Sequence, residues 1–383
     1  MIKSTLLLSF AVRLMLGLAL ISAFLSLLAI GAGHVFLNDW EFVFTAKAKN
    51  DGNSTIYIVD GERHLVHRVT DSKINSLSPS WSPATNQVVY VSNVTGTSQI
   101  YGSGLDGHAR QLTSGTYSHT LPSWSPDSKN IAYISHETPG GEIYISDADG
   151  NNSHLVPLDM PVDSMPRWSP DGTRLLFAST DKYHHNITLD GAITINETLT
   201  LNAYDASHLP DGSHLSAETN VYTVTLDGNL HPLTESLAFN AYDPVWSPDG
   251  QDIVFPVDDS DGTNIYLLNG GGNPQRISQG SQLNRCPVWS PDSRHIALVS
   301  QQGGITGLFV MDADGSNRRM IVKSMGSILY QPIWSPDNRF VAFVLTEKGQ
   351  NKIYGIDIND GSRRLLSPAV PGTVILDKIC YSN

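Results

Sequence analysis

Residues 167–177, RWSPDGTRLLF, decide the fold. Proline presets φ at the first central position of a turn, and an aspartate side chain can hydrogen-bond its own backbone, so Ser-Pro-Asp-Gly predicts a tight turn. The apolar run that follows is short and bounded by turn residues, which is typical of a β-strand. The stretch therefore predicts two strands joined by a hairpin turn.

The tripeptide Trp-Ser-Pro recurs along the chain at successive steps of 43, 44, 78, 43 and 45 residues. A period of about 44 residues with four short strands per repeat is typical of a β-propeller blade. We name the four strands A to D, with Trp-Ser-Pro at the end of strand A. The tryptophans that mark the repeat, and to which we assign a structural role, are Trp81, Trp124, Trp168, Trp246, Trp289 and Trp334.

Aromatic residues at the centres of strands B and C are spaced by eleven residues, as in Tyr90 to Tyr101 and Phe343 to Tyr354. This constant spacing predicts a constant pairing register between the two strands. Strand C then ends in an Asp-Gly pair, for example Asp149-Gly150, which is a strong hairpin signal leading into strand D.

Closure of the ring is predicted from a mismatch in the repeat. The strand C aromatic occurs seven times, but Trp-Ser-Pro occurs only six times. Residues 41–70 supply strands B, C and D without strand A, and the apolar segment Thr373–Tyr381 is left over at the end. Pairing the two would remove exposed sheet edges. We expect an all-β, seven-bladed propeller closed by N- and C-terminal strands; a six-bladed propeller with residues 41–70 as a detached hairpin is the alternative.

The Trp-Ser-Pro-Asp-Gly motif, followed by Ile-Tyr and an Asp-Gly turn, resembles the repeat of the TolB-like, WD-repeat-like propellers. The resemblance covers residues 41 to the end of the chain. It implies a propeller fold, and such propellers have many unrelated functions. Unlike TolB itself, the chain has an apolar segment in place of an α/β domain before the propeller.

The N-terminal segment predicts a transmembrane helix. Residues 14–37 contain no Lys, Arg, Asp or Glu, and as a helix would extend about 36 Å, enough to cross a bilayer. Lys3 and Arg13 precede it, whereas Asp39 and Glu41 follow it. The positive-inside rule therefore places residues 1–13 in the cytoplasm and residues 38–383 outside, in the periplasm or the extracellular space. A cleaved signal peptide is the alternative.

Charge and cysteine content exclude several classes of site. The formal charge of −13 argues against binding to nucleic acid or to an anionic lipid surface, because both need clustered Lys and Arg. Cys286 and Cys380, the only cysteines, match no zinc or redox spacing, and we expect no disulfide between them. We expect no cofactor and no metal.

The step of 78 residues contains an insert at about residues 180–217, between strands B and C of one blade. Its alternating hydrophobicity around Asp190-Gly191 predicts an extra β-hairpin. An insert that one blade alone carries is a candidate binding loop. Its histidines match no ligand spacing and are interpreted as surface residues, with transition-metal ligation as the alternative. These candidate binding residues are His184, His185, His208 and His214.

The acidic turns are expected to lie together, because A–B and C–D turns share one end of a propeller and the insert lies at the other. Ordinary turn capping accounts for each aspartate, for example Asp127 and Asp314. The functional interpretation is that this acidic rim attracts a basic partner or cations. Short acidic runs such as Asp147-Ala-Asp149-Gly150 resemble parts of calcium loops but lack the later bidentate Glu.

The function expected from these observations is binding rather than catalysis. The sequence contains neither a Gly-x-Ser-x-Gly elbow nor a His-Glu-x-x-His motif. We therefore expect a membrane-anchored, TolB-like platform that binds a protein or a cell-envelope polymer. The alternative is a hydrolase or lyase that acts on carbohydrate or peptide in the central channel.

Overall fold

The computed structural model describes residues 41–47, 53–60, 65–180 and 219–366, apart from residues 83, 106, 236, 238, 281, 282, 326–331, 348 and 349. The chain divides into the units Met1–Asn38 and Asp39–Asn383. Every helix or strand of the described residues is a β-strand, which confirms the all-β class. The predicted span at residues 14–37, the insert hairpin and the closing segment Thr373–Tyr381 lie outside the described residues. Among the described residues, no helix has the length and apolar character needed to cross a membrane.

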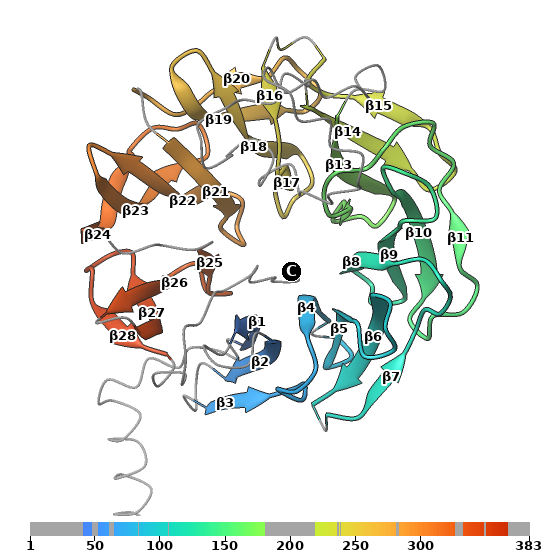
Figure 1. The fold of residues 1–383 in the computed structure, drawn as a ribbon. Coiled ribbons are helices and arrows are strands. Elements are labelled where there is room, and N and C mark those ends of the chain that lie inside the picture. Colours follow the sequence, from blue (N-terminus) through green and yellow to red (C-terminus); the bar gives the residue numbers. More distant parts are fainter. Residues whose placement is uncertain are drawn as a thin grey trace, which may run out of the picture. The chain divides into compact units, whose positions relative to one another are not determined.

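The strands of the unit Asp39–Asn383 form consecutive antiparallel meanders arranged in a ring (Figure 1). They are β1 (Glu41–Lys47), β2 (Ser54–Asp60) and β3 (Leu65–Arg68); β4 (Ser76–Ser82), β5 (Gln87–Ser92), β6 (Gln99–Gly104) and β7 (Ala109–Gln111); β8 (His119–Trp124), β9 (Asn130–Ser135), β10 (Glu142–Asp147) and β11 (His154–Leu155); β12 (Arg167–Trp168), β13 (Arg174–Thr180), β14 (Thr219–Thr225) and β15 (Leu230–Pro232); β16 (Asn240–Ala241), β17 (Val245–Trp246), β18 (Asp252–Asp259), β19 (Gly262–Asn269) and β20 (Gln275–Arg276); β21 (Leu283–Trp289), β22 (His295–Gln302), β23 (Ile305–Asp312) and β24 (Arg319–Met325); and β25 (Ile333–Trp334), β26 (Phe340–Glu347), β27 (Gln350–Asp357) and β28 (Arg363–Leu365).

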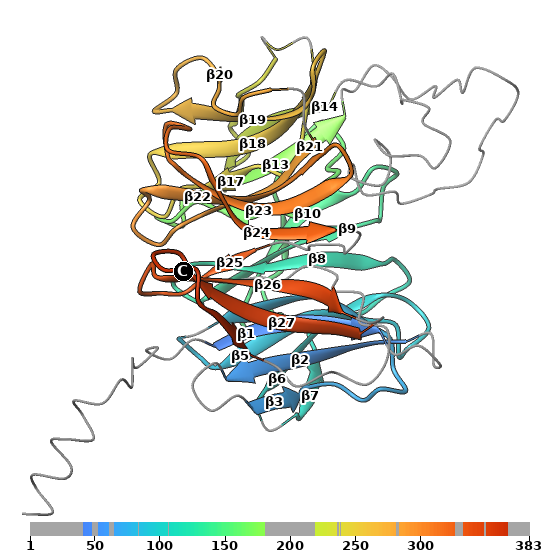
Figure 2. The same ribbon diagram turned by 90° about the vertical axis from the view of Figure 1, so that its left-hand side faces the viewer.

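Each meander is a separate sheet except for β16–β24, where a single parallel pair, Thr263 with Leu283, joins two meanders into one nine-stranded sheet. The Trp-Ser-Pro strands β4, β8, β17, β21 and β25 lie innermost in the ring, and strands such as β7, β11 and β24 lie outermost (Figure 1). Seen edge-on, β23, β24, β26 and β27 lie on one side of the ring (Figure 2). This order of strands is the one the repeat predicts.

The predicted register between strands B and C is confirmed. Tyr90 pairs with Tyr101, and Phe343 pairs with Tyr354. In both pairs the rings stack with their centroids 6.0 Å apart. Phe44 with Tyr57 repeats this stack at 5.5 Å in the first meander. Residues opposite each other on paired strands have neighbouring side chains, so the eleven-residue spacing brings two rings together, whereas Phe309 pairs with Leu298 and has no ring opposite it.

The core lies between neighbouring meanders rather than within any one sheet. Ile134 and Ile143 of β9 and β10 form one buried cluster with Trp168 and Leu175 of β12 and β13. A similar cluster joins Leu308 of β23 with Trp334 of β25. The tryptophan of each repeat thus packs against the meander before it, and each apolar sheet face is buried by the next repeat.

The same tryptophans join the inner strands by hydrogen bonds. The indole Nε1 of Trp168 donates to the carbonyl oxygen of Ser123 at 3.1 Å, that of Trp289 to Val245 at 3.3 Å, and that of Trp334 to Val288 at 3.2 Å. Each acceptor is the residue before the tryptophan of the preceding repeat. The structural role assigned to these residues is consistent with this contact and with exposures of 8% or less for all six.

The first meander contains three strands, β1, β2 and β3, and its inner edge strand is β1. Strands B, C and D are therefore present for residues 41–70 as expected, without a strand A among the described residues. The ends of the insert are also fixed, because β13 and β14 pair from Arg174 with Thr225 to Thr180 with Thr219. The insert connects two strands that end side by side, as a B–C connection should.

We predict that Trp289→Phe lowers the free energy of unfolding by about 1 kcal/mol, because it removes a buried hydrogen bond but keeps most of the apolar contact. Trp124→Phe is the matched control, since the Trp124 indole nitrogen is buried without a partner among the described residues. Urea unfolding followed by tryptophan fluorescence measures both. Equal losses in the two variants would contradict a stabilising role for the indole hydrogen bond.

Candidate binding surface

The antiparallel meanders give the ring two different ends. The A–B and C–D turns lie at one end, which we call the turn end. The B–C hairpins and the D–A connections lie at the other, which we call the insert end because β13 and β14 meet the insert there. Each end contains a different set of polar side chains, so the two are described separately.

At the turn end, the aspartates of the Ser-Pro-Asp turns are bonded within their own turns. The Ser169 hydroxyl donates to Asp171 Oδ1 at 2.5 Å, and the Thr173 backbone N–H donates to the same oxygen at 3.0 Å. Ser169 Oγ in turn accepts the N–H of Arg174 at 3.0 Å, at the start of β13. The same Ser-to-Asp bond occurs in Ser125–Asp127, Ser247–Asp249, Ser290–Asp292 and Ser335–Asp337. These carboxylates therefore cap turns.

This bonding favours the charged carboxylate. The Ser169 hydroxyl, followed by the Thr173 backbone N–H, holds the pKa of Asp171 below its ordinary value, and Ser125 does the same for Asp127. A carboxylate with a lowered pKa in the folded state stabilises the fold above its unfolded pKa, and this contribution is lost as the pH falls through the folded pKa.

We therefore predict that Asp171→Asn reduces the free energy of unfolding by about 1 kcal/mol at pH 7 and that this difference shrinks below about pH 4. Urea unfolding at pH 7, 5 and 3 tests this. Glu235→Gln is the control, because Glu235 is exposed and makes no hydrogen bond or ion pair with the described residues. A deficit of Asp171→Asn that is constant with pH would refute the linkage.

The acidic run Asp147–Gly150 forms its own closed turn. Asp147 Oδ1 accepts the backbone N–H groups of Asp149 and Asn151 at 3.0 and 2.8 Å, and Oδ2 accepts the Asn152 amide at 3.0 Å. Asp149 pairs with Arg110 at 2.6 Å. Across the described part of the chain, no three His, Cys, Asp or Glu side chains are grouped so that they could hold a metal ion.

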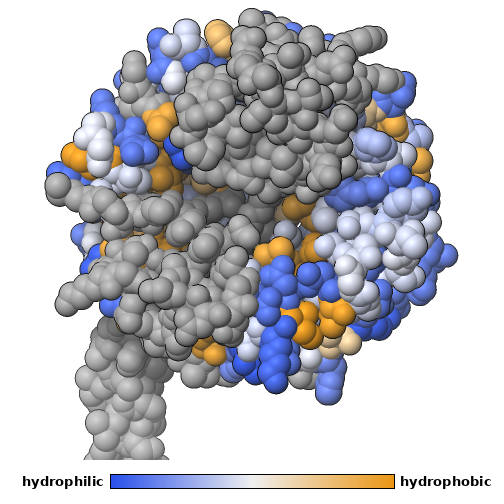
Figure 3. Space-filling view, viewed as in Figure 1, coloured by the Kyte–Doolittle hydropathy of each residue, from blue (hydrophilic) through white to orange (hydrophobic). Residues whose placement is uncertain are grey.

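The insert end carries exposed apolar side chains over β4–β9. Val94, in the hairpin between β5 and β6, is 51% exposed, and Tyr117, in the connection to β8, is 48% exposed. These segments are adjacent, since the Gln99 amide donates to the Tyr117 carbonyl oxygen at 2.8 Å. Figure 3 shows hydrophobic residues gathered over β4, β5 and β6 among hydrophilic ones. A mixed surface of this kind is suited to binding a macromolecule.

Two histidines lie beside this surface, on β8 and after β9. The His119 ring meets the Tyr133 ring edge-on at 5.4 Å, and His136 Nε2 lies 2.8 Å from Thr120 Oγ1. Burial lowers the pKa of both imidazoles, and the neighbouring His136 lowers that of His119 further. Burial therefore favours the neutral form of both rings. No sequence motif predicted that these two histidines lie together, because each lies in a strand or hairpin that is otherwise regular.

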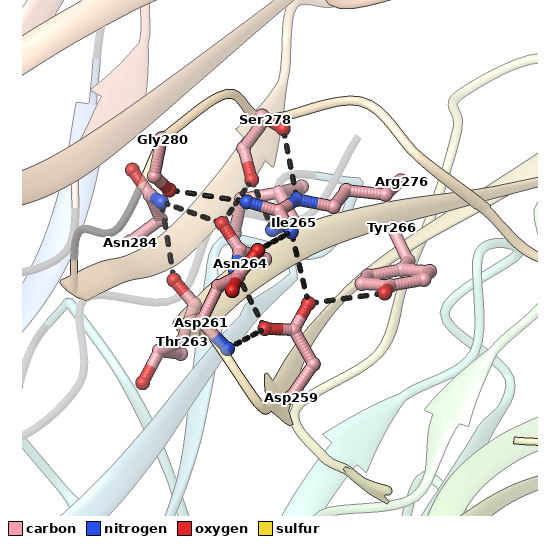
Figure 4. Close-up of polar contacts among 10 residues, drawn as sticks. All are labelled: Asp259, Asp261, Thr263, Asn264, Ile265, Tyr266, Arg276, Ser278, Gly280 and Asn284. Carbon is pink, nitrogen blue, oxygen red and sulfur yellow. Dashed lines mark hydrogen bonds and ion pairs between the residues drawn. The ribbon is translucent and has the colours of Figure 1, made fainter. Parts of the chain in front are cut away.

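A dense polar cluster supports the hairpin between β18 and β19 at the same end (Figure 4). The Asp259 side chain is only 4% exposed, and its carboxylate accepts bonds from Asn264 Nδ2 at 2.9 Å and the Tyr266 hydroxyl at 3.0 Å. Arg276 lies 3.6 Å from Asp259 and donates to Asp261 at 2.8 Å. Every oxygen of the buried carboxylate has a donor, which makes the cluster a rigid support.

The same cluster contains a hydroxyl that recurs at the end of strand D. Ser278 Oγ accepts the N–H of Ile265 at 2.9 Å and donates to Asn264 Oδ1 at 2.8 Å. Asn284 of β21 reaches across to the Thr263 carbonyl oxygen at 3.1 Å. Equivalent hydroxyls that accept a strand C backbone N–H are those of Thr70, Thr113 and Thr234. These hydroxyls at the end of strand D therefore lock strand C to strand D.

We predict that Ser278→Ala destabilises the fold by about 1–3 kcal/mol, because it removes the acceptor of the buried Ile265 N–H and the shorter of the two hydrogen bonds to Asn264 Oδ1. Ser316→Ala serves as the control, since Ser316 is an exposed turn residue whose hydroxyl bonds only aspartates of its own turn, Asp312 at 3.3 Å and Asp314. Chemical denaturation of both variants provides the measurement. A Ser278→Ala loss no larger than that of the control would rule out the locking role.

The other residues selected from the sequence are the insert histidines and the two cysteines, and only one of them lies within the described residues. The candidate binding residues His184, His185, His208 and His214 lie outside the described residues, as does Cys380. Cys286 lies in β21. Its backbone has a φ of 51°, in the left-handed region, directly before Pro287. Ser78, Leu121 and Asp243 have the same conformation before a proline in neighbouring inner segments, at φ values of 48°, 52° and 42°.

Comparison with known proteins supports the repeat assignment. Residues 204–372, somewhat less than half of the chain, match the family model of the TolB β-propeller domain. A comparison with curated proteins gives no significant match.

Solved structures show the same fold at low sequence identity. TolB from Acinetobacter baumannii is 19% identical over 87% of this chain and 65% of its own, with a TM-score of 0.51. An oligogalacturonate lyase from Vibrio parahaemolyticus is 13% identical over 88% of this chain and 89% of its own, with a TM-score of 0.60. An acylaminoacyl peptidase from Pyrococcus horikoshii is 18% identical over 77% and 46%, with a TM-score of 0.53. The chain spans less than two thirds of the TolB and peptidase chains.

These structures have different functions on one scaffold, so the similarity establishes the fold alone. The family match and the spacing of Trp-Ser-Pro agree on the kind of repeat. The repeats of this chain are TolB-like β-propeller repeats.

Proposed function

We propose that this chain is a membrane-anchored, extracytoplasmic, seven-bladed β-propeller that acts as a binding platform for a protein or a cell-envelope polymer. In this proposal, Thr373–Tyr381 completes the first blade, and residues 14–37 hold the propeller at the membrane. The binding surface is the insert end.

The proposal rests on the difference between the two ends of the ring. At the turn end, the aspartates of the Ser-Pro-Asp repeat are used by their own turns. At the insert end, exposed Val94 and Tyr117 lie on a surface that also receives the only long insertion in the repeat. Exposed aromatic and apolar side chains beside a variable loop on a rigid scaffold are typical of a recognition surface.

The rigid cluster around Asp259 supports the same assignment. It holds the β18–β19 hairpin in one conformation, and Thr219, the first described residue after the insert, donates its N–H to Asn240 Oδ1 of β16 at 2.9 Å. The end of the insert is therefore tied to the meander that contains this hairpin. Preorganised supports of this kind reduce the entropy cost of binding.

The experiment is affinity capture by the full-length chain from detergent-solubilised membranes. We compare the wild type, a variant with residues 183–216 replaced by a Gly-Asn turn, and Tyr117→Ala. We expect a specific protein or polymer to be retained by the wild type and lost with both changes, because both alter the insert end. Leu105→Ser is the matched control, since Leu105 is 54% exposed at the turn end.

Retention of the same partner by all variants would overturn the assignment of the surface. If a folded wild type retains neither a protein nor a polymer, the platform function is wrong, and assays for cleavage of glycans and peptides become the next step. Membrane anchoring is tested separately, by resistance of the full-length chain to alkaline carbonate extraction.

A further inference from the structure

The formal charge is distributed unevenly along the chain. Residues 1–284 contain 29 acidic and 13 basic side chains, whereas residues 285–383 contain 8 acidic and 11 basic ones. The two parts carry charges of −16 and +3, which together give the −13 of the whole chain. The net charge of the whole chain therefore conceals an excess of basic residues in residues 285–383.

The fold collects several of these residues on the meanders β21–β24 and β25–β28. Arg319, at the start of β24, donates to the carbonyl oxygen of Ile358, just after β27. Arg339 bonds Asp357 Oδ2 at 2.6 Å, and that carboxylate is only 1% exposed. The Arg363 guanidinium stacks over Tyr354 at 4.4 Å from the ring centroid. Arg319 of one meander and Arg339 of the next thus contact the adjacent residues Ile358 and Asp357, and the carboxylate that Arg339 bonds is buried.

The outer strand of the same region is unusually long. β24 contains seven residues, whereas the other outermost strands, β3, β7, β11, β15, β20 and β28, contain two to four. β24 ends the sheet among the described strands and lies on the outside of the ring (Figures 1 and 2). A long edge strand offers unpaired backbone N–H and C=O groups to another extended chain.

The side chains of β24 are suited to an acidic partner. Arg319 and Lys323 are exposed, and Met320 is 44% exposed. Lys323 makes no ion pair with any residue that the structure describes. Exposed cations on either side of an apolar side chain would pair with carboxylates of a peptide that also offers apolar contact.

We propose that the outer edge of β24, with the neighbouring arginines of β28, binds an extended acidic peptide segment of a partner protein as an added β-strand. This site lies on the outer edge of a meander that contains neither Val94, Tyr117 nor the insert, and it does not depend on the proposed function. The β-bulge at Ile321, between the Leu308–Val322 and Phe309–Met320 pairs, divides the edge. Val322–Met325 is the regular part on which the added strand pairs, and Arg319 and Arg363 lie beyond the bulge.

The rival explanation is that cations and a bulge protect this edge from association. Full-length protein in non-ionic detergent distinguishes the two. The probe is a fluorescent ten-residue peptide of alternating Glu and Val, with a Lys-Val peptide as the charge control and an N-methylated Glu-Val peptide that cannot complete the backbone ladder. Fluorescence anisotropy at 50 and 300 mM salt gives the dissociation constants.

We expect the Glu-Val peptide to bind more weakly at high salt, and the Lys-Val and N-methylated peptides to bind at least about tenfold more weakly than Glu-Val. The double variant R319E/K323E should lose about tenfold in affinity. R110E/K129E is the matched control, because it makes the same charge change at exposed positions of other meanders, and it should bind within about twofold of the wild type. Tryptophan fluorescence verifies folding of both.

Failure of the Glu-Val peptide to bind, or equal affinity for the Lys-Val peptide, would overturn the proposal and favour a protected edge. Equal binding of the N-methylated peptide would reject strand addition. The variant with residues 183–216 replaced should bind the Glu-Val peptide as the wild type does. The outcome is therefore independent of whether the insert end binds its own partner.

Discussion

The contact between each Trp-Ser-Pro segment and the repeat before it is the interaction on which the structure depends. A single meander has two apolar faces and cannot bury both by itself. The indole covers the neighbouring sheet, and in three repeats its N–H bonds the preceding inner strand, as Trp289 bonds Val245. Three residues after the tryptophan, the Asp carboxylate fixes the turn that directs the chain into strand B. One short motif therefore sets both the hairpin and the spacing between repeats.

This dependence explains what could be predicted from the sequence. The turn chemistry and the eleven-residue aromatic spacing are local, and local signals gave the strand order and the pairing of Tyr90 with Tyr101. The role of the Ser278 hydroxyl was not predicted, because its partners Asn264 and Ile265 lie more than ten residues away in the sequence. The acidic turns were correctly predicted as turns, and the hydrogen bonds within each turn explain why these aspartates cap rather than form an open site.

The polar groups of the insert end were much harder to predict, for a physical reason. His119 and Asp259 occupy ordinary positions of the repeat, and only their neighbours on other strands make them distinctive. Composition also averages over the chain. The net charge of −13 gives no sign that Arg319, Arg339 and Arg363 gather on two adjacent meanders. Charge patterning along the sequence would have shown the reversal after residue 284, but only the fold places these arginines beside one another.

A repeat scaffold allows such differences because its stability is distributed over equivalent interfaces. Where one interface is polar, as at Asn264 and Asn284, hydrogen bonds replace apolar contact without changing the register. The scaffold also tolerates a long outer strand such as β24, because packing between the inner strands already holds the ring together. Features that the scaffold does not need for folding are therefore the best places to look for recognition. By this criterion the insert end and the β24 edge are the two surfaces selected by the physical chemistry of the repeat, and the capped turns are not.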